Sequence, residues 1–148
     1  MRAAVLSSVL FLGLVACDEE PAPAAEQWTV DCTGAQAFQL GMTVTSPAGV
    51  TVALEDAAPA PLDVGDNAWT LSVTDAGGAP LTGLTPLVRP WMPLHGHGVS
   101  PTHYPGEEVA DGVYQVEIFD VIMPGLWEFH VELNDQGDEA TFALCAEG

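Results

Sequence analysis

The sequence predicts an all-β domain: an antiparallel β-sandwich of six to seven strands with immunoglobulin-like architecture. Apolar side chains alternate with polar or small ones along most of the chain, which is typical of half-buried strands. Turn-forming residues separate these runs at short intervals, and the capped periodicity of a helix is missing from the pattern. Six or seven short strands in about 120 residues suit a sandwich of two packed layers.

The alternation places the elements in order. On the fourth expected strand, Tyr114, Val116 and Ile118 share one face. On the fifth, His130 lies opposite Trp127 and is expected to be exposed. The expected strands are 38–44, 50–54, 69–73, 113–118, 127–133 and 140–144, with turns at 46–49, 75–78, 111–112, 124–125 and 134–137.

The first 16 residues resemble an export signal. Arg2 supplies a positive charge, and residues 3–15 form an apolar run shorter than the roughly 20 residues that span a bilayer. Leu-Val-Ala-Cys at positions 14–17 resembles the lipobox of bacterial lipoproteins, which implies cleavage before Cys17 and diacylglycerol on its sulfur. The alternative is an ordinary secretory signal followed by an incidental cysteine.

The predicted organisation is a signal peptide at 1–16, a lipidated cysteine with a flexible tether at 17–27, and one folded domain at 28–148. Each CH₂ group of an acyl chain that enters the membrane contributes about 0.8 kcal/mol of binding free energy, so two or three chains hold a protein there stably. We therefore expect the chain in the cell envelope, facing the periplasm or the exterior. The sequence leaves the choice between inner and outer membrane open.

Charge excludes one class of function. The whole chain carries 21 acidic and two basic side chains, a formal net charge of −19. Loss of Arg2 with the signal leaves only Arg89, giving −21 + 1 = −20. Such a surface repels nucleic acid, whose binding depends on Lys and Arg, and it gathers cations.

The cysteines indicate an oxidising compartment. With Cys17 assigned to the lipid, Cys32 and Cys145 remain as one pair near the two ends of the domain. We expect a structural disulfide between them. A redox role is the weaker alternative, because the two do not form a Cys-x-x-Cys motif.

Residues 89–106 break the alternation. Three of the four histidines, His95, His97 and His103, fall inside nine residues, and Met92 precedes them. The surrounding prolines and glycines predict a shaped loop without regular strand or helix. Imidazole binds Cu(II) and Zn(II), and thioether sulfur selects Cu(I), so the combination favours copper, with zinc as an alternative.

Alternate side chains of an extended His-x-His point the same way, so His95 and His97 are expected to share one ion. Gly96 and Gly98 allow close approach of the backbone. His103 or Met92 would complete the site, and Met123 is a more distant candidate. The alternative is a solvent-exposed turn with Met92 packed in the core.

Several short motifs then resemble the YtkA-like domain family. They occupy residues 66–73, 79–81, 91–98, 114–119 and 123–127. The resemblance implies an immunoglobulin-like domain outside the cytoplasm with links to copper handling, as in the related FixH and CopC-type domains. Leu94 stands where the family has a second Met before the histidine, which shifts the expected site toward histidine-dominated Cu(II) or Zn(II).

Three functions compete on this sequence. The first is a membrane-tethered copper chaperone or buffer, serving a copper-handling or oxidase-assembly protein. The second is a metal-free interaction or envelope-structural module that docks through residues 91–104, with aromatic anchors. The third, carbohydrate binding by Trp28, Trp69 or Trp91, lacks a paired aromatic platform. An enzyme is not expected, because nucleophile, metalloprotease and phosphate-loop motifs are missing from the sequence.

Overall fold

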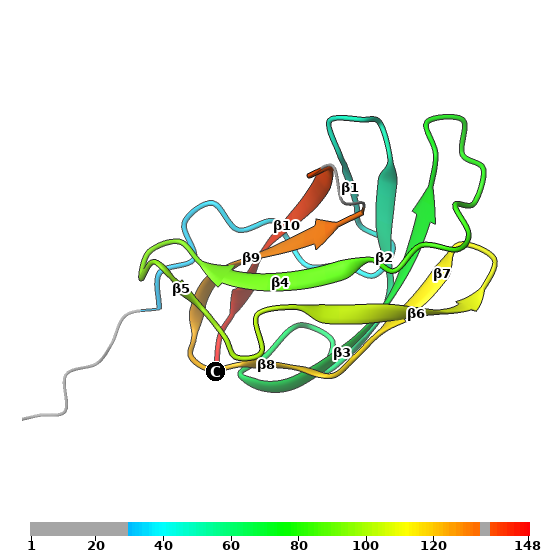
Figure 1. Cartoon of the computed structure of the whole chain (residues 1–148). Helices are drawn as coiled ribbons and strands as arrows, with labels where there is room; N and C mark the ends of the chain where they lie inside the picture. Colours follow the sequence, from blue (N-terminus) through cyan, green and yellow to red (C-terminus); the bar gives the residue numbers. More distant parts are fainter. Residues whose placement is uncertain (1–29, 134–136) are drawn as a thin grey trace, which may run out of the picture.

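The computed structural model describes residues 30–133 and 137–148, and its regular structure there is entirely β (Figure 1). The strands are β1 Thr43–Thr45, β2 Thr51–Ala58, β3 Gly65–Thr74, β4 Leu87–Met92, β5 His97–Gly98, β6 Tyr104–Ala110, β7 Val113–Val116, β8 Phe119–Val121, β9 Gly125–Glu132 and β10 Glu139–Ala146. The predicted all-β class and antiparallel pairing are confirmed. Within these two ranges, no helix is long and apolar enough to cross a membrane. The expected signal, Cys17, the tether, Trp28 and most of the 134–137 turn lie outside the described residues.

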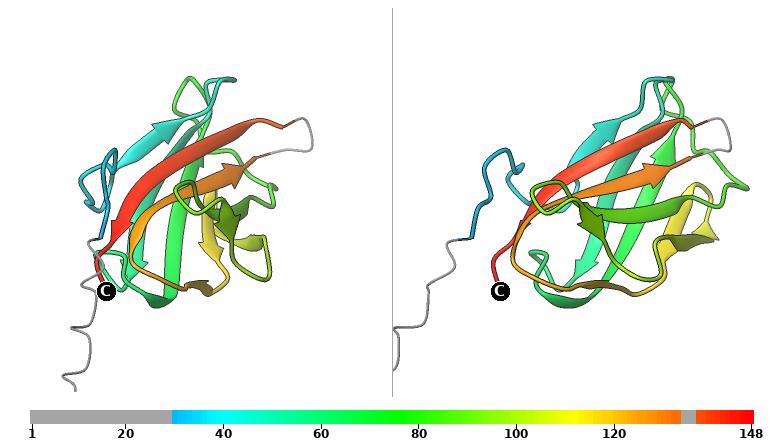
Figure 2. Two further views of the ribbon diagram at one scale, coloured as in Figure 1. Left: turned by 90° about the vertical axis from the view of Figure 1, so that its left-hand side faces the viewer. Right: turned by 60° about the vertical axis from the view of Figure 1, so that its left-hand side comes forward.

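The strands form one continuous sheet in the order β1-β2-β3-β7-β6-β4-β9-β10, with β5 paired to β4 and β8 to β3. Strand β6 joins the two halves, because it pairs with β7 at one end and with β4 at the other. Strands β1 and β10, at the two ends of this order, contact each other. Figure 2 shows that β9 and β10 lie on the opposite side of the domain from β2 and β3. The sheet therefore curls into a nearly closed barrel around the core.

The prediction of six to seven strands was too low, and the expectation of an irregular loop over 89–106 was wrong. Strands β4, β5 and β6 run through this region. Strand β4 pairs with β6 at Leu87 and Val88 and with β5 at Trp91 and Met92. Pro90 lies between these two pairings, and at this position β4 pairs with β9 on one side only. The other side of the strand is locally an edge, where a proline is tolerated because no hydrogen bond needs its missing N–H.

Two strand boundaries also differ from the prediction. The first expected strand reduces to Thr43–Thr45, because Gly41 turns the chain with φ +80° and leaves Leu40 exposed. Ile118 is exposed instead of continuing the apolar face, because β7 ends at Val116 before β8 pairs with the far end of β3. Alternation alone does not show where a strand changes its partner.

The core is centred on Trp69. Its ring lies 4.7 Å from that of Phe129, 5.1 Å from Phe119 and 5.8 Å from Phe142, measured between centroids. Among residues 30–133 and 137–148, the buried Trp69 indole N–H has no hydrogen-bond partner. Predicted inward positions on β3, β9 and β10 are buried, so the alternation was interpreted correctly there.

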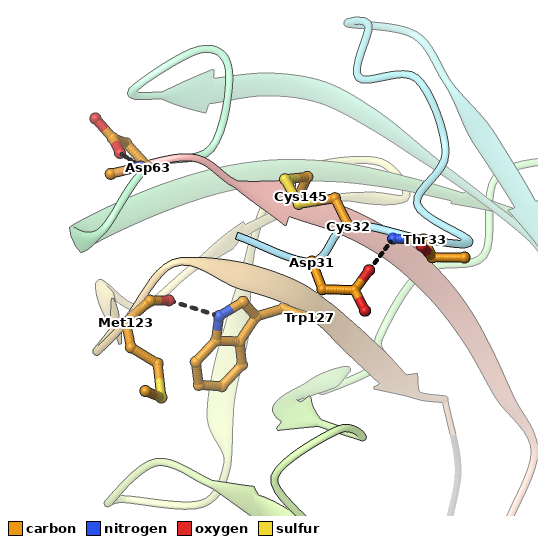
Figure 3. The surroundings of a disulfide bond; sticks show 8 residues. Asp31, Cys32, Thr33, Asp63, Met123, Trp127 and Cys145 are labelled. Carbon is orange, nitrogen blue, oxygen red and sulfur yellow. Dashed lines mark hydrogen bonds between the residues drawn. A yellow bond between two sulfur atoms is a disulfide. The ribbon is translucent and has the colours of Figure 1, made fainter. Parts of the chain in front are cut away.

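The expected disulfide is present. Cys32 and Cys145 are joined across a sequence separation of 113, with their Cα atoms 5.4 Å apart. The bond ties the entering chain to the end of β10, and the Leu126 N–H donates to the Asp31 carbonyl beside it at 3.0 Å (Figure 3). The start of the domain is therefore fixed against β9 and β10.

We predict that replacing both cysteines, Cys32→Ser with Cys145→Ser, lowers the free energy of unfolding by about 4–5 kcal/mol, because the unfolded chain regains loop entropy. Urea denaturation measures the loss. A reductant should destabilise the natural protein by a similar amount and leave the double variant unchanged. An equal effect of reductant on both proteins would contradict this assignment.

Glu108 organises the β6–β7 turn. Its carboxylate accepts N–H groups of Gly83 at 2.7 Å and Gly112 at 3.0 Å. Those two hydrogen bonds lower the pKa of the Glu108 carboxyl below its ordinary value. Gly112 has φ +68°, and a Cβ there would lie 2.7 Å from Pro80, so the turn also requires glycine.

Because the folded pKa of Glu108 is depressed, its contribution to stability is present above the ordinary glutamate range, about pH 4.3. It is lost as pH falls through the lower folded value. We therefore predict that Glu108→Gln lowers the melting temperature at pH 7 and that this difference shrinks as the pH falls below the ordinary glutamate range. Thermal melts across this range test the prediction, with Glu107→Gln as the control. A pH-independent difference between Glu108→Gln and the natural protein would rule it out.

Candidate metal site

The β4–β5 hairpin places the first candidate ligands. Met92 pairs with His97 across the hairpin, and Trp91 pairs with Gly98. The turn closes where the Met92 carbonyl accepts the N–H of His95 at 3.2 Å and of Gly96 at 2.9 Å. Gly96 takes φ +66° there.

Gly98 allows the hairpin to close. A Cβ on this residue would lie 2.7 Å from the Pro90 carbonyl oxygen, closer than real contacts permit. The predicted close backbone approach at Gly98 is therefore present. Directly opposed residues of an antiparallel pair project to the same face. Met92 is 1% exposed, so its cross-strand partner His97 is also directed inward.

His95 and His97 lie close enough to share an ion. Their ring centroids are 5.8 Å apart, with planes inclined at 65°. A metal bound about 2.0–2.1 Å from an imidazole nitrogen sits roughly 3.2 Å from that ring's centroid. Two rings around one ion can thus be separated by up to about 6.4 Å. The observed separation falls inside that limit.

The hydrogen bond of His97 leaves one nitrogen available. Its Nδ1 lies 3.0 Å from the Gly98 carbonyl oxygen, which can only accept a hydrogen bond. Nδ1 therefore carries the proton, and Nε2 keeps the lone pair that binds metals. A backbone carbonyl on the far ring nitrogen is the usual partner of metal-bound histidines.

A surface pocket of about 420 Å³ lies beside this hairpin. Two thioethers and one imidazole line it together: Met92, Met123 and His95. The other lining residues are Val30, Asp31, Leu94, Pro124 and Gly125. Met123 comes from the β8–β9 connection, so two separate segments contribute the candidate ligands, and the entering chain at Val30 and Asp31 forms a third part of the wall.

Trp127 connects these two segments. Its buried indole N–H donates to the Met123 carbonyl at 3.0 Å, as Figure 3 shows, and fixes the β8–β9 connection. The same indole packs edge-on against the His97 ring, with centroids 6.1 Å apart. One rigid core residue therefore holds Met123 and His97 in a fixed relation.

Asp31 is a lining residue whose carboxylate is turned toward Thr33 (Figure 3). The carboxylate accepts the Thr33 N–H at 2.9 Å, and this backbone hydrogen bond, followed by one from the Thr33 side chain, lowers the Asp31 pKa. The carboxylate therefore remains charged at neutral pH and adds to the negative charge of the surface near the pocket.

His103 lies away from this pocket. Its Nδ1 is 2.8 Å from the Thr102 hydroxyl, and its Nε2 is 3.2 Å from a Glu132 carboxylate oxygen. Glu132 also accepts the Arg89 Nε at 3.2 Å. His103 thus belongs to an ion-pair network on the outer face of β4 and β9. The structure does not bring this predicted ligand to the other three.

His130 was expected to be exposed, but its side chain is largely covered. Its side chain is only 15% exposed, because Glu128 and Glu139 flank the ring at 3.3 Å and 3.0 Å and Thr141 bonds it at 3.2 Å. It does lie on the outer face of β9, opposite Trp127. Long glutamate side chains on neighbouring strand positions cover it.

Among the described residues, no three His, Cys, Asp or Glu side chains are grouped to hold a metal. The pocket therefore depends on sulfur from methionine for a third ligand. Sequence reasoning ranked Met123 as distant because it lies 31 residues beyond Met92, and it did not identify Asp31 or Trp127. The Met-Pro-Gly-Leu-Trp run at 123–127 was the available signal.

A family model named YtkA-like matches residues 45–132. The chain belongs to the YtkA-like family. The matched span covers β2 to β9, so Met92, His95 and Met123 lie inside it, whereas Val30, Asp31, both disulfide cysteines and β10 lie outside. The search of curated proteins and that of solved structures each found no match.

Gly125 determines how deeply Met92 enters this YtkA-like pocket. A Cβ on Gly125 would lie 2.5 Å from the Met92 methyl carbon. We predict that Gly125→Ala displaces that methyl group, seen as a shift of its ¹³C-methyl NMR signal. Gly41→Ala is the control, since Gly41 also has positive φ but a Cβ there meets nothing within 4 Å. Equal shifts of the Met92 signal in both variants would refute this.

Proposed function

We propose that this YtkA-like protein is a membrane-anchored, extracytoplasmic lipoprotein that binds copper and acts as a chaperone or buffer. The observation that carries the proposal is the meeting of imidazole and thioether side chains at one pocket. Met92, His95 and His97 come from the β4–β5 hairpin, and Met123 comes from the β8–β9 connection. Nitrogen and sulfur ligands together suit copper better than magnesium, calcium or manganese, which prefer oxygen.

Rigidity supports the proposal. The hairpin is closed by strand pairing, Met123 is held through Trp127, and the entering chain is tied to β9 and to the disulfide. Ligands on a stiff scaffold need little rearrangement to bind an ion. An immunoglobulin-like sandwich, proposed here as the architecture, presents such hairpins at the end of a packed β core.

The location follows from the N-terminal segment. Lipid on Cys17 would anchor the chain, and the disulfide fits an oxidising compartment outside the cytoplasm. Val30 lines the pocket, and positions 17–29 reach at most about 45 Å even when fully extended. The pocket would therefore stay close to the membrane. Its partner would be a copper-handling or oxidase-assembly protein at that membrane.

A metal-free docking module is the second candidate. Exposed apolar side chains border the pocket: Val30 is 42% exposed and Leu94 is 58% exposed, with Ile122 at 50% in the adjoining β8–β9 connection. Neighbouring exposed apolar side chains of this kind often mark a surface that another protein covers. This candidate requires no metal and predicts a partner bound equally well by the metal-free protein.

Titration of the full chain in detergent micelles with copper tests the proposed function. We predict that the natural protein binds one copper ion and that the double variant His95→Ala/His97→Ala loses most of this affinity. His103→Ala is the matched control, because this imidazole lies outside the pocket, and it should bind normally. Acidification should weaken binding, since protons compete for imidazole nitrogen. Equally weak binding by the natural protein and the double variant would reject the function.

A further inference from the structure

The wall of the pocket contains two sulfur atoms. Met92 and Met123 both line it, and they come from two different segments of the chain. Thioethers are neutral, soft ligands that favour Cu(I) over Cu(II) and Zn(II).

We propose that the ion taken by this pocket is Cu(I), bound by the sulfur atoms of Met92 and Met123 and by one imidazole nitrogen of His95. This inference rests on the proposed function and specifies its metal and oxidation state. His97 supplies a second imidazole beside His95, so the His95–His97 pair is the nitrogen-rich alternative for Cu(II).

The surroundings favour a singly charged ion. Leu94, Val30 and Pro124 make most of the remaining wall apolar. Moving an ion from water into apolar surroundings costs more as its charge rises. With neutral sulfur and imidazole ligands, Cu(I) brings one positive charge into the pocket, whereas Cu(II) and Zn(II) bring two.

The ligand count points the same way. Zn(II) sites in proteins take four ligands from Cys, His, Asp and Glu, or three of them together with a water molecule. In the part of the chain that the structure describes, not even three such side chains are grouped. Two sulfur atoms and one imidazole form a three-ligand set, which the pocket offers without recruiting His103 or any other distant residue.

Competition for copper between the full chain in micelles and a chromophoric Cu(I) chelator tests the proposal, under anaerobic reducing conditions. Met123→Leu should weaken Cu(I) binding by at least about tenfold. Loss of a residue that only supports a metal ligand already lowers metal affinity by about 10–100-fold, and Met123 is itself a proposed ligand. Its Cu(II) affinity, measured separately under air, should remain near that of the natural protein. His97→Gln should show the reverse pattern.

Met42→Leu is the matched control, because Met42 is a buried core methionine that does not line the pocket. Both Met→Leu changes conserve volume, and thermal melts confirm that the variants fold. Cu(I) binding by Met123→Leu equal to that by Met42→Leu would overturn the proposal. So would a natural protein that binds Cu(II) or Zn(II) more tightly than Cu(I), although the proposed function would then stand. A natural protein that binds copper in neither oxidation state would overturn both.

Discussion

The candidate site depends on the register of one short hairpin. Pairing of Met92 with His97 directs a thioether and an imidazole to the same inward face, and the turn between them presents His95 beside the same pocket. The close approach of Gly98 to the Pro90 carbonyl permits that register. Because β4 is held by β9, a slip of one residue in β5 would turn His97 to the opposite face and separate it from Met92 and Trp127.

The histidines of this YtkA-like protein divide into two groups by their surroundings. His95 lines the pocket, and His97 lies beside it with the ring centroids 5.8 Å apart. His103 and His130 lie on the outer face of the sheet, where Glu128, Glu132 and Glu139 hold them by hydrogen bonds. The acidic surface thus gives two of the four imidazoles structural partners. Only the pair near the two thioethers remains suited to bind a soft ion.

Much of the fold could be predicted from local patterns, because alternation marks which residues of β3, β9 and β10 face the core. The Cys32–Cys145 disulfide could be predicted because two cysteines remained at the ends of one domain. Strands β4, β5 and β6 were missed because proline and glycine normally interrupt strands. Here Pro90 and the nearby glycines are accommodated because of how β4 pairs with its neighbours, which the local sequence does not show. Likewise, nothing local to Met123 shows that it meets Met92, and nothing local to His103 shows that Glu132 binds it.

The central claim is that two segments of the chain place sulfur and imidazole nitrogen around one copper ion. X-ray absorption spectroscopy of the copper-loaded chain, labelled with selenomethionine, tests it most directly because selenium and nitrogen scatter differently. We expect copper–selenium scattering from two neighbours together with imidazole scattering, and loss of one selenium neighbour in Met123→Leu. A first shell of nitrogen and oxygen alone would contradict the account.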